Sequence, residues 1–309
     1  MIEIPRKEAA KQPARVCLLG EGRWGKAAGT ILSENGHQTF FVHHTQADWP
    51  RAFDLLCLAI PVQHVRETLR RLPPPPVPVV SLGKGLEIDT GFRVSQIVRD
   101  VWGNEAVAAL SGPNFAAEIL QGLPAATVAA SQDEALATRV QQIFHNRRFR
   151  VYRSADIIGV EIGGAMKNVY GIAGGLCAGL ELGENASASL LPRSLAEMSR
   201  LGLCLGGRSE TFAGLSGLGD LILTARSRQS RNFLLGYHLA RGVSLKEALG
   251  MARGVVEGVP TTASVHKNPL FRDIKKPLAE EIYRILFEGK EIRRSLLDLL
   301  EREAAPELG

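Results

Sequence analysis

Short apolar runs alternate with helical patterns over the first half of the chain. The runs that predict strands lie at residues 14–20, 37–44, 54–60, 77–81, 106–110, 125–130 and 149–153. Their lengths and spacing are typical of buried strands joined by crossover helices, which predicts a doubly wound α/β sheet. After Ser154 the pattern is only helix and loop, and the tail, residues 278–303, has the pattern of two amphipathic helices. We therefore expect one domain over residues 1–154 and an all-helical domain over 155–309.

The most apolar helical stretch carries a lysine in its middle. Residues 160–203 predict two long helices separated at a Gly-Glu-Asn sequence, and the first of them is rich in glycine. Each glycine costs a helix about 1 kcal/mol relative to alanine, which indicates that neighbouring backbone comes very close. Lys167 has Gly163, Gly164 and Gly171 on its own helix face. A lysine among such neighbours can donate a proton near neutral pH, although it could also extend to solvent.

Composition narrows the class of protein. The 309 residues are 45% hydrophobic and 22% charged, as in an ordinary folded enzyme. The net charge is +5, only 6% of the residues are aromatic, and basic and aromatic residues are not interleaved. This pattern argues against a nucleic-acid partner and suits a small anionic substrate.

The cysteines and the N-terminus bear on the compartment. Cys17, Cys57, Cys177 and Cys204 stand singly, without the spacing of a metal site or a disulfide framework. They are typical of buried residues in a reducing compartment. The first residues lack the apolar segment of a signal peptide, and no run approaches the roughly 18 apolar residues of a membrane span. We expect a cytoplasmic location, no stable membrane insertion and no bound metal.

A glycine-rich turn follows the first expected strand. Gly20, Gly22 and Gly25 form G-x-G-x-x-G between that strand and a helical stretch, which is the setting of a Rossmann dinucleotide site. The glycines permit a tight turn, the approach of a pyrophosphate and close packing of helix on strand. The next strand ends at His43 and His44, where an acid would bind the ribose of NAD, so its absence favours NADPH over NADH. The alternative is an ordinary glycine-rich turn.

Two further strands end in candidate site residues. Lys84 lies between two glycines at the end of a strand, on the edge where open α/β sheets bind ligands. Gly112 and Asn114 follow the next strand, and we expect Asn114 to cap the helix after it.

A second cluster lies in the helical half. A glycine run ends at Asp220, and Ser230, Arg231 and Asn232 open a helix. A hydroxyl, a guanidinium and an amide at a helix N-terminus suit a phosphate monoester. A Ser or Asn cap with a surface Arg is the alternative. Glu257 follows in a glycine-flanked loop.

These clusters together resemble a known family. In chain order, the runs GEGRWG, SLGKGLE, SGPNFA, AMKNV, GLGD, SRN and VVEG are similar to those of NAD(P)-dependent glycerol-3-phosphate dehydrogenase of the soluble bacterial type. The resemblance implies reduction of dihydroxyacetone phosphate to sn-glycerol 3-phosphate by NADH or NADPH, which supplies the backbone of phospholipids. It also implies a Rossmann domain followed by a helical domain of the 6-phosphogluconate dehydrogenase type.

The resemblance implies roles for individual residues. Lys167 would be the general acid/base, Lys84 would hold substrate near the cofactor, and Asp220 would orient Lys167 or the substrate. The residues implied to bind substrate are Lys84, Gly112, Asn114, Lys167, Asp220, Ser230, Arg231 and Asn232. Those implied to border the dinucleotide are Gly20, Gly22, Arg23, Trp24, Gly25, His43, His44, Lys84, Ala116, Arg231, Val255 and Glu257.

The chain departs from the family pattern after the second strand. Only residues 45–53 lead to the third strand, where the family has a longer segment with a helical region. His43 and His44 replace the usual Arg, which leaves the preference for NAD or NADP open. Asn114 stands where the family often has Ser or Thr.

Two other functions fit parts of the sequence. The first is a related dehydrogenase of a ketopantoate or a 3-hydroxy acid, which would have less need of residues 230–232. The second is a non-catalytic sensor of NAD(P)H, which would have no need of Lys84, Lys167 and Asp220. The glycine-rich helix could pack within its domain or against a second subunit, so a homodimer is an expected arrangement.

Overall fold

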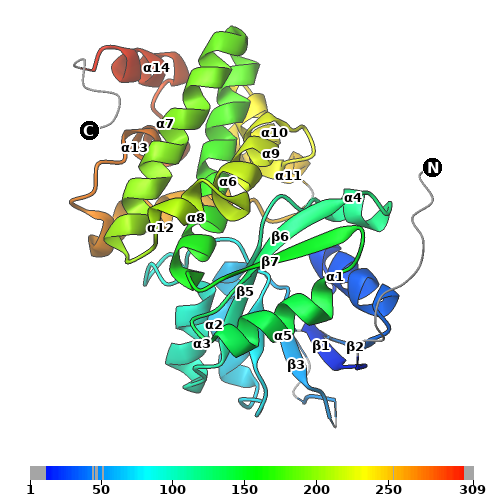
Figure 1. Cartoon of the computed structure of the whole chain (residues 1–309). Coiled ribbons are helices and arrows are strands. Elements are labelled where there is room, and N and C mark those ends of the chain that lie inside the picture. The colour runs from blue at the N-terminus through cyan, green and yellow to red at the C-terminus, as the bar shows by residue number, and fades with distance from the viewer. Residues whose placement is uncertain (1–11, 44, 46–47, 51, 253, 303–309) are drawn as a thin grey trace.

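The N-terminal half is a sheet in a computed structural model that describes residues 12–43, 45, 48–50, 52–252 and 254–302 (Figure 1). The strands are β1 (Arg15–Leu19), β2 (Gln38–Val42), β3 (Leu55–Leu58), β4 (Val79–Ser81), β5 (Val107–Ser111), β6 (Ala125–Ala130) and β7 (Phe149–Ser154). Their order is β2-β1-β3-β4-β5-β6-β7, and β1 to β5 run parallel. Because β2 and β3 lie on opposite sides of β1, the carboxyl ends of β1 and β3 form the switch point where such sheets bind ligands. The predicted Rossmann sheet is confirmed.

The last two strands reverse the direction of the sheet. β6 pairs antiparallel with β5, with Ser111 opposite Val128, and β7 runs parallel to β6. The sequence pattern does not reveal this reversal, because the direction of a strand depends on the path of the preceding connection. The reversal places Thr127 beside Gly112, the residue that follows β5.

Helices cover both faces of the sheet. They are α1 (Arg23–Glu34), α2 (Val62–Arg71), α3 (Val94–Trp102), α4 (Ala116–Leu120) and α5 (Glu134–Phe144). Successive residues of a strand point to opposite faces, so Leu18 packs with α1 and α5 whereas Leu19 packs with α2 and α3. A sheet buried on both faces explains why its strands are continuous apolar runs.

The second half of the described chain is helical. Its elements are α6 (Ile157–Gly179), α7 (Gly183–Cys204), α8 (Ser209–Phe212), the π-helical turn η1 (Leu215–Gly219), α9 (Asp220–Arg226), α10 (Arg231–Ala240), α11 (Leu245–Met251), α12 (Gly258–Lys267), the 3-10 turn η2 (Pro269–Phe271), α13 (Pro277–Phe287) and α14 (Ile292–Leu300). α6 runs among the other helices and is buried along nearly its whole length (Figure 1). The break between the two long helices lies just before the Gly-Glu-Asn sequence, which forms the first turn of α7.

The glycines of α6 allow other helices to approach its backbone, as the sequence predicts. A Cβ on Gly175 would lie 1.9 Å from the carbonyl oxygen of Phe233 in α10. A Cβ on Gly174 would lie 2.2 Å from the carbonyl oxygen of Ala225 in α9. The glycine-rich face is therefore used within the chain, and it gives no reason to expect a second subunit against it.

Aromatic residues hold the short connector between β2 and β3. Trp49 Nε1 donates a hydrogen bond to the carbonyl oxygen of Pro73 at 2.8 Å, and its ring contacts those of Phe53 and Trp102. The short connection from β2 to β3 is thus packed by aromatic contacts, although it lacks the longer segment that the family pattern has between these strands.

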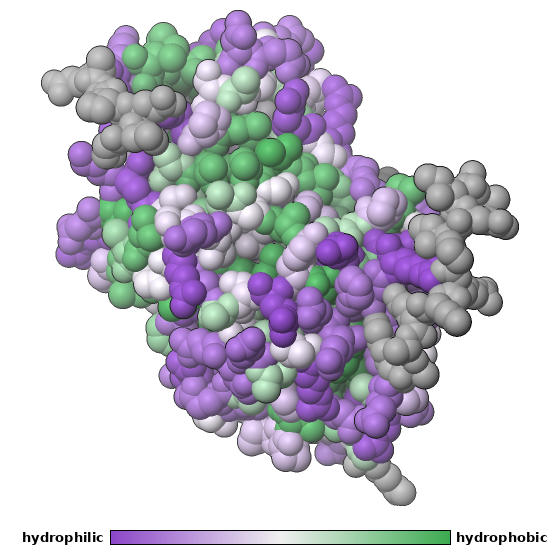
Figure 2. All heavy atoms as spheres, viewed as in Figure 1, coloured by the Kyte–Doolittle hydropathy of each residue, from purple (hydrophilic) through white to green (hydrophobic). Residues whose placement is uncertain are grey.

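The surface differs between the two halves. Figure 2 shows mainly hydrophilic side chains over the half that contains the sheet, and a gathering of hydrophobic ones over the helical half. Exposed hydrophobic residues of the helical half include Leu203 of α7 and Ile222 of α9. Within the described ranges, every helix is too short or too polar to cross a bilayer.

Candidate active site

The turn between β1 and α1 has the geometry that a dinucleotide needs. Gly20 has a φ of +111°, and a Cβ on it would lie 2.8 Å from the carbonyl oxygen of Ala59. A Cβ on Gly25 would lie 2.2 Å from the carbonyl oxygen of Gly20, so only glycine fits at this position in the first turn of α1. The Cβ position of Gly22 faces open space, with no atom within 4 Å. The three glycines therefore fit a tight turn, close packing and an approaching pyrophosphate.

Two helices of the candidate site begin with an arginine. Arg23 is the first residue of α1, and Arg231 is the first residue of α10. Burial, together with the charge of Arg23, lowers the pKa of Arg231, and Glu257 opposes this shift. Two cations that destabilise each other beside helix N-termini suit a ligand with several negative charges.

Four other residues are expected to border the dinucleotide, namely Trp24, Ala116, His43 and His44. Trp24 has a buried Nε1 without a hydrogen-bond partner in the described structure, and Ala116 opens α4. The Nδ1 of His43 lies 2.8 Å from Thr45 Oγ1. His44 lies outside the described residues. The contact of these histidines with a ribose or a phosphate stays a prediction.

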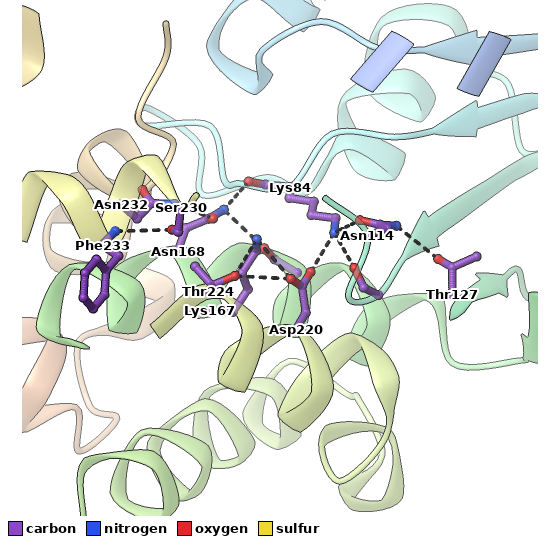
Figure 3. A network of polar contacts seen from close by, with 12 residues as sticks. Lys84, Asn114, Thr127, Lys167, Asn168, Asp220, Thr224, Ser230, Asn232 and Phe233 are labelled. Carbon is purple, nitrogen blue, oxygen red and sulfur yellow. Dashed lines mark hydrogen bonds and ion pairs between the residues drawn. The ribbon is translucent and has the colours of Figure 1, made fainter. Parts of the chain in front are cut away.

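Lys84, Lys167 and Asp220 form one buried ionic cluster (Figure 3). Lys84 follows β4, Lys167 lies in the middle of α6, and Asp220 begins α9 directly after the turn η1. Asp220 Oδ2 lies 2.6 Å from Lys84 Nζ, and Asp220 Oδ1 lies 3.2 Å from Lys167 Nζ. Only 1% of Asp220 and 8% of Lys167 are exposed. One carboxylate therefore bridges two ammonium groups.

The two lysines differ in how many of their N–H groups are already paired. An ammonium group has three donors. Besides the shared carboxylate, Lys84 Nζ donates to the carbonyl oxygen of Gly112 and to Asn114 Oδ1, both at 2.8 Å. Besides the same carboxylate, Lys167 Nζ donates to Thr224 Oγ1 at 3.0 Å. Counting the described residues, all three donors of Lys84 have acceptors, whereas Lys167 has one donor left for a ligand.

Burial and charge set the protonation of this cluster. Burial lowers the pKa of Lys84 to about 8; the charge of Asp220 opposes this shift and that of Lys167 adds to it. Burial alone would raise the pKa of the Asp220 carboxyl, but the two ammonium groups hold it below its ordinary value. Asp220 is therefore ionised at neutral pH, and Lys84 is easier to deprotonate than an exposed lysine.

A chain of amides connects the start of α10 to the loop of Lys84. Asn232 Nδ2 donates to Asn168 Oδ1 at 2.7 Å, and Asn168 Nδ2 donates to the carbonyl oxygen of Lys84 at 2.8 Å. The N–H of Gly258 donates to Asn232 Oδ1 at 2.9 Å. Ser230 Oγ accepts a main-chain N–H of α10 at 3.2 Å, so this hydroxyl caps the helix. The structure thus connects Asn232 to the loop of Lys84 through Asn168, whereas Ser230 caps α10.

Glu257 joins the helical half to the sheet. Its Oε1 accepts the N–H of Val62, the first residue of α2, at 3.1 Å, and its Oε2 is buried without a partner in the described structure. Burial raises the pKa of this carboxyl to about 7, against the opposing effects of that hydrogen bond and of the charges of Arg231 and Lys167. Val255, two residues earlier, is 38% exposed. Glu257 therefore lies where the two halves meet, within reach of the charges of the site.

Asn114 does not cap the helix that follows it, so this prediction is wrong. α4 begins at Ala116, its N-cap residue is Phe115, and no side chain caps it. The amide of Asn114 instead accepts from Lys84 and donates to Thr127 Oγ1 at 3.4 Å. The ammonium prevails because a hydrogen bond from a charged donor is roughly twice as strong as one from a neutral N–H.

Sequence reasoning assigned no role to three polar residues of this site, namely Asn168, Thr224 and Thr127. Thr224 follows Asp220 by four residues, so helical spacing places both on one face and could have found it. Asn168 is adjacent to Lys167, but adjacency in a helix does not indicate a shared face. The sequence around Thr127 does not indicate a role in the site, because Thr127 reaches the site only through the reversed direction of β6. Across the described residues, no three His, Cys, Asp or Glu side chains gather to hold a metal ion.

A dinucleotide turn at a sheet switch point, beside a lysine pair with one member from the sheet and one from the helical half, defines the class of pyridine-nucleotide dehydrogenases. Two sequence models narrow the class. The family model of the NAD-dependent glycerol-3-phosphate dehydrogenase N-terminus matches residues 47–137. The model of the C-terminus of the same family matches residues 156–296. The chain belongs to this family.

Individual relatives are similar over nearly their whole length. Glycerol-3-phosphate dehydrogenase (NAD(P)+) of Trichormus variabilis is 40% identical over 304 residues, which cover 96% of this chain and 99% of that protein. The protein of the same name from Moorella thermoacetica is 40% identical over 327 residues, covering 95% and 97%. The crystal structure of glycerol-3-phosphate dehydrogenase from Coxiella burnetii has a TM-score of 0.88 at 31% identity, covering 94% of this chain and 99% of that one. The family predicted from the motifs is confirmed.

Proposed function

We propose that the chain reduces dihydroxyacetone phosphate to sn-glycerol 3-phosphate with NADH or NADPH, for use in phospholipid synthesis. The observation that carries this proposal is the ammonium group of Lys167. It is buried, it is paired with Asp220 and Thr224, and one of its donors has no acceptor among the described residues. A donor held in this way can give its proton to an oxygen of a ligand.

Reduction of a ketone needs a hydride and a proton. A bound nicotinamide supplies the hydride when the cofactor is present. Lys167 stabilises the negative charge that develops on the carbonyl oxygen and then gives that oxygen a proton. Asp220 offsets the loss of water around Lys167 and holds its Nζ in place. Thr224 fixes the same nitrogen from a second direction.

The phosphate of the substrate needs an anchor close to this donor. Arg231 and the first N–H groups of α10 offer a guanidinium fork and a helix N-terminus, which together suit a phosphate monoester. The amide chain from Asn232 through Asn168 fixes this anchor relative to Lys84. An unphosphorylated ketone would make no use of Arg231, so the arrangement favours a phosphorylated one.

Oxidation of NADPH and of NADH, followed by nicotinamide absorbance, tests the proposal. We expect turnover with dihydroxyacetone phosphate and none with dihydroxyacetone. The variant Lys167→Ala should bind the cofactor normally, and its kcat should fall by a factor of about 10²–10⁴. The control Lys246→Ala, on the exposed surface of α11, should have the kcat of the unmodified chain. Cofactor binding without turnover of either ketone would favour the alternative function, a non-catalytic sensor of NAD(P)H. Equal activity of Lys167→Ala would remove Lys167 from the mechanism.

Three finer statements belong to the same proposal. The dinucleotide domain is proposed to be residues 1–154 and the substrate domain 155–309, with support from the end of β7 at Ser154 and the start of α6 at Ile157. A cytoplasmic location is supported by cysteines that stand alone in apolar runs; Cys17, Cys57 and Cys177 are buried as expected, whereas Cys204 is exposed. A homodimer is supported by the hydrophobic side chains on the helical half in Figure 2, and sedimentation would measure it.

A further inference from the structure

The side chain of Glu161 crosses from the helical half of the chain to the sheet half. Glu161 lies in α6, whereas three donors to its carboxylate lie at the start of α3. Its Oε1 accepts the main-chain N–H of Ser95 at 2.9 Å. Its Oε2 accepts Arg93 Nη1 at 2.6 Å and Ser95 Oγ at 2.5 Å. One carboxylate of the helical half thus pairs with a guanidinium of the sheet half and holds the first turn of a helix there.

This link between the two halves is shielded from water. Only 6% of Glu161, 8% of Arg93 and 9% of Ser95 are exposed. The same contacts would gain little at an exposed surface, where water competes for both charged groups. In the interior, the loss of one charged partner leaves the other buried without a counter-charge, which is costly. The contacts therefore oppose any movement that would separate α6 from α3.

The contact of Glu161 is one end of a longer seat of α6 on the sheet half. Glu161, Gly164 and Asn168 are spaced by three and four residues, so they share one face of the helix. At Asn168, the side-chain Nδ2 donates to the carbonyl oxygen of Lys84 at 2.8 Å (Figure 3). At Gly164, a Cβ would lie 2.6 Å from Ser111 Oγ at the end of β5. Two hydrogen-bonded ends, about 10 Å apart along the helix, fix both its position and its rotation on the sheet half.

Building on the proposed function, we propose that Glu161, Arg93 and Ser95 are positioning residues, which set where Lys167 lies relative to the dinucleotide turn. Lys167 is adjacent to Asn168, so a shift or rotation of α6 on the sheet half carries its ammonium group along. The dinucleotide turn belongs to β1 and α1, so the hydride donor and the proton donor are held by different halves. A misplacement of about 1 Å can cost a reaction about 100-fold in rate. The three residues therefore act on the hydride step through the placement of α6.

Loss of the charge of Glu161 should slow the hydride step. We expect Glu161→Gln to lower the single-turnover rate with dihydroxyacetone phosphate by about 10- to 100-fold, using whichever of NADH and NADPH the chain oxidises faster. Stopped-flow absorbance of the nicotinamide, with cofactor limiting and ketone saturating, follows this step without product release. The Kd of the cofactor should stay within about threefold, because the glycine-rich turn is unchanged.

The variant Glu281→Gln is the matched control for a general loss of stability. Only 7% of Glu281 is exposed, and its carboxylate pairs with Arg284 and Lys290, both at 2.6 Å. All three residues belong to the helical half, so this cluster does not link the halves. Both variants should lower Tm by about 5–10 °C, but only Glu161→Gln should slow the single turnover. An unchanged rate in Glu161→Gln, or an equal loss of rate in the two variants, would overturn the proposal.

The variant Ser95→Ala keeps the proposal testable if Glu161→Gln does not fold. It removes one donor and leaves the ion pair of Arg93 and Glu161 in place. We expect the single-turnover rate to fall by about two- to fivefold, whereas Ser33→Ala at the exposed end of α1 should leave it unchanged. The same rate in Ser95→Ala and the unmodified chain would overturn the proposal.

Hydrogen exchange tests the link without any turnover. In Glu161→Gln, the amides of residues 94–98 should exchange about tenfold faster, because the N–H of Ser95 loses a charged acceptor, and in Glu281→Gln they should not. Unchanged exchange in Glu161→Gln would overturn the proposal. Absence of turnover in the unmodified chain would refute the proposed function alone, since the exchange still tests how α6 is held.

Discussion

Removing the charge of Asp220 would test the ionic cluster most directly. Asp220→Asn keeps the size of the side chain but removes the carboxylate that Lys84 and Lys167 share. At an effective dielectric constant of about 20, the contact of 2.6 Å is worth about 6 kcal/mol and that of 3.2 Å about 5 kcal/mol. Desolvation offsets most of this attraction, and removal of one partner of a buried ion pair costs about 3–5 kcal/mol. We expect the free energy of unfolding near neutral pH to fall by that amount.

The pH dependence of this loss follows from the direction of the shift. Because the pKa of Asp220 in the folded chain lies below its ordinary value of 3.8, its stabilising effect is present above that pH and is lost as the pH falls through the folded pKa. The advantage of the unmodified chain over Asp220→Asn should therefore be largest near neutral pH and shrink in acid. Denaturant unfolding, followed by tryptophan fluorescence at several pH values, measures this difference.

Turnover of Asp220→Asn should also fall, by about 10²–10³ in kcat. Two neighbouring ammonium groups without their shared carboxylate repel each other, and Lys84, whose pKa burial already lowers to about 8, is expected to lose its proton more readily. Asp298→Asn serves as the control, because Asp298 pairs with Lys290 at the surface of α14. Unchanged stability and turnover in Asp220→Asn would refute the reasoning, since the lysines would then need no counter-charge.

Three further predictions address the anchor, the packing and a second buried acid. Arg231→Ala should raise KM for dihydroxyacetone phosphate about tenfold or more, and a loss confined to cofactor affinity would contradict the phosphate assignment. Gly175→Ala would place a Cβ 1.9 Å from the carbonyl oxygen of Phe233 and should lower the free energy of unfolding by about 1–3 kcal/mol, whereas Gly250→Ala, which meets no atom within 4 Å, should not lower it. Burial raises the pKa of the Glu197 carboxyl to about 7, and the hydrogen bonds to this carboxyl oppose the shift. The protonated carboxyl therefore stabilises the fold fully below its ordinary pKa of 4.5, and this stabilisation is lost as the pH rises through 7. Glu197→Gln should lack this decline, and parallel pH profiles of unfolding would contradict the assignment.

The strands and their helices could be predicted because each is encoded locally. A run such as residues 125–130 is apolar between polar turns, and that is enough to predict β6. Its direction is not encoded in the run, since it depends on how the chain returns after α4. The reversal therefore could not be predicted, and neither could the arrival of Thr127 beside Gly112.

The site was predictable to the extent that its residues stand out from their neighbours. Lys84 between glycines and Lys167 in an apolar helix are unusual in their surroundings, so both could be found without a structure. Asn114 was also found, but its partner was not, because a cap is a local interaction and the ammonium of Lys84 arrives from another strand. Residue types thus indicate which groups take part, and the pairing among them requires the fold.

The contact of α6 with α10 also bears on which substrates can react. At Gly175 and Gly236 the two helices meet main chain against main chain, so at these positions no side chain between them can adjust by a change of rotamer. Lys167 lies on one of these helices and Arg231 begins the other, so the proposed proton donor and the proposed phosphate anchor belong to two helices in close main-chain contact. This pair of helices acts as a spacer of fixed length between the phosphate and the carbonyl of a bound molecule. Under the proposed function, a phosphorylated ketone with a longer carbon chain would hold its carbonyl away from Lys167, and this spacing would then select substrates by length.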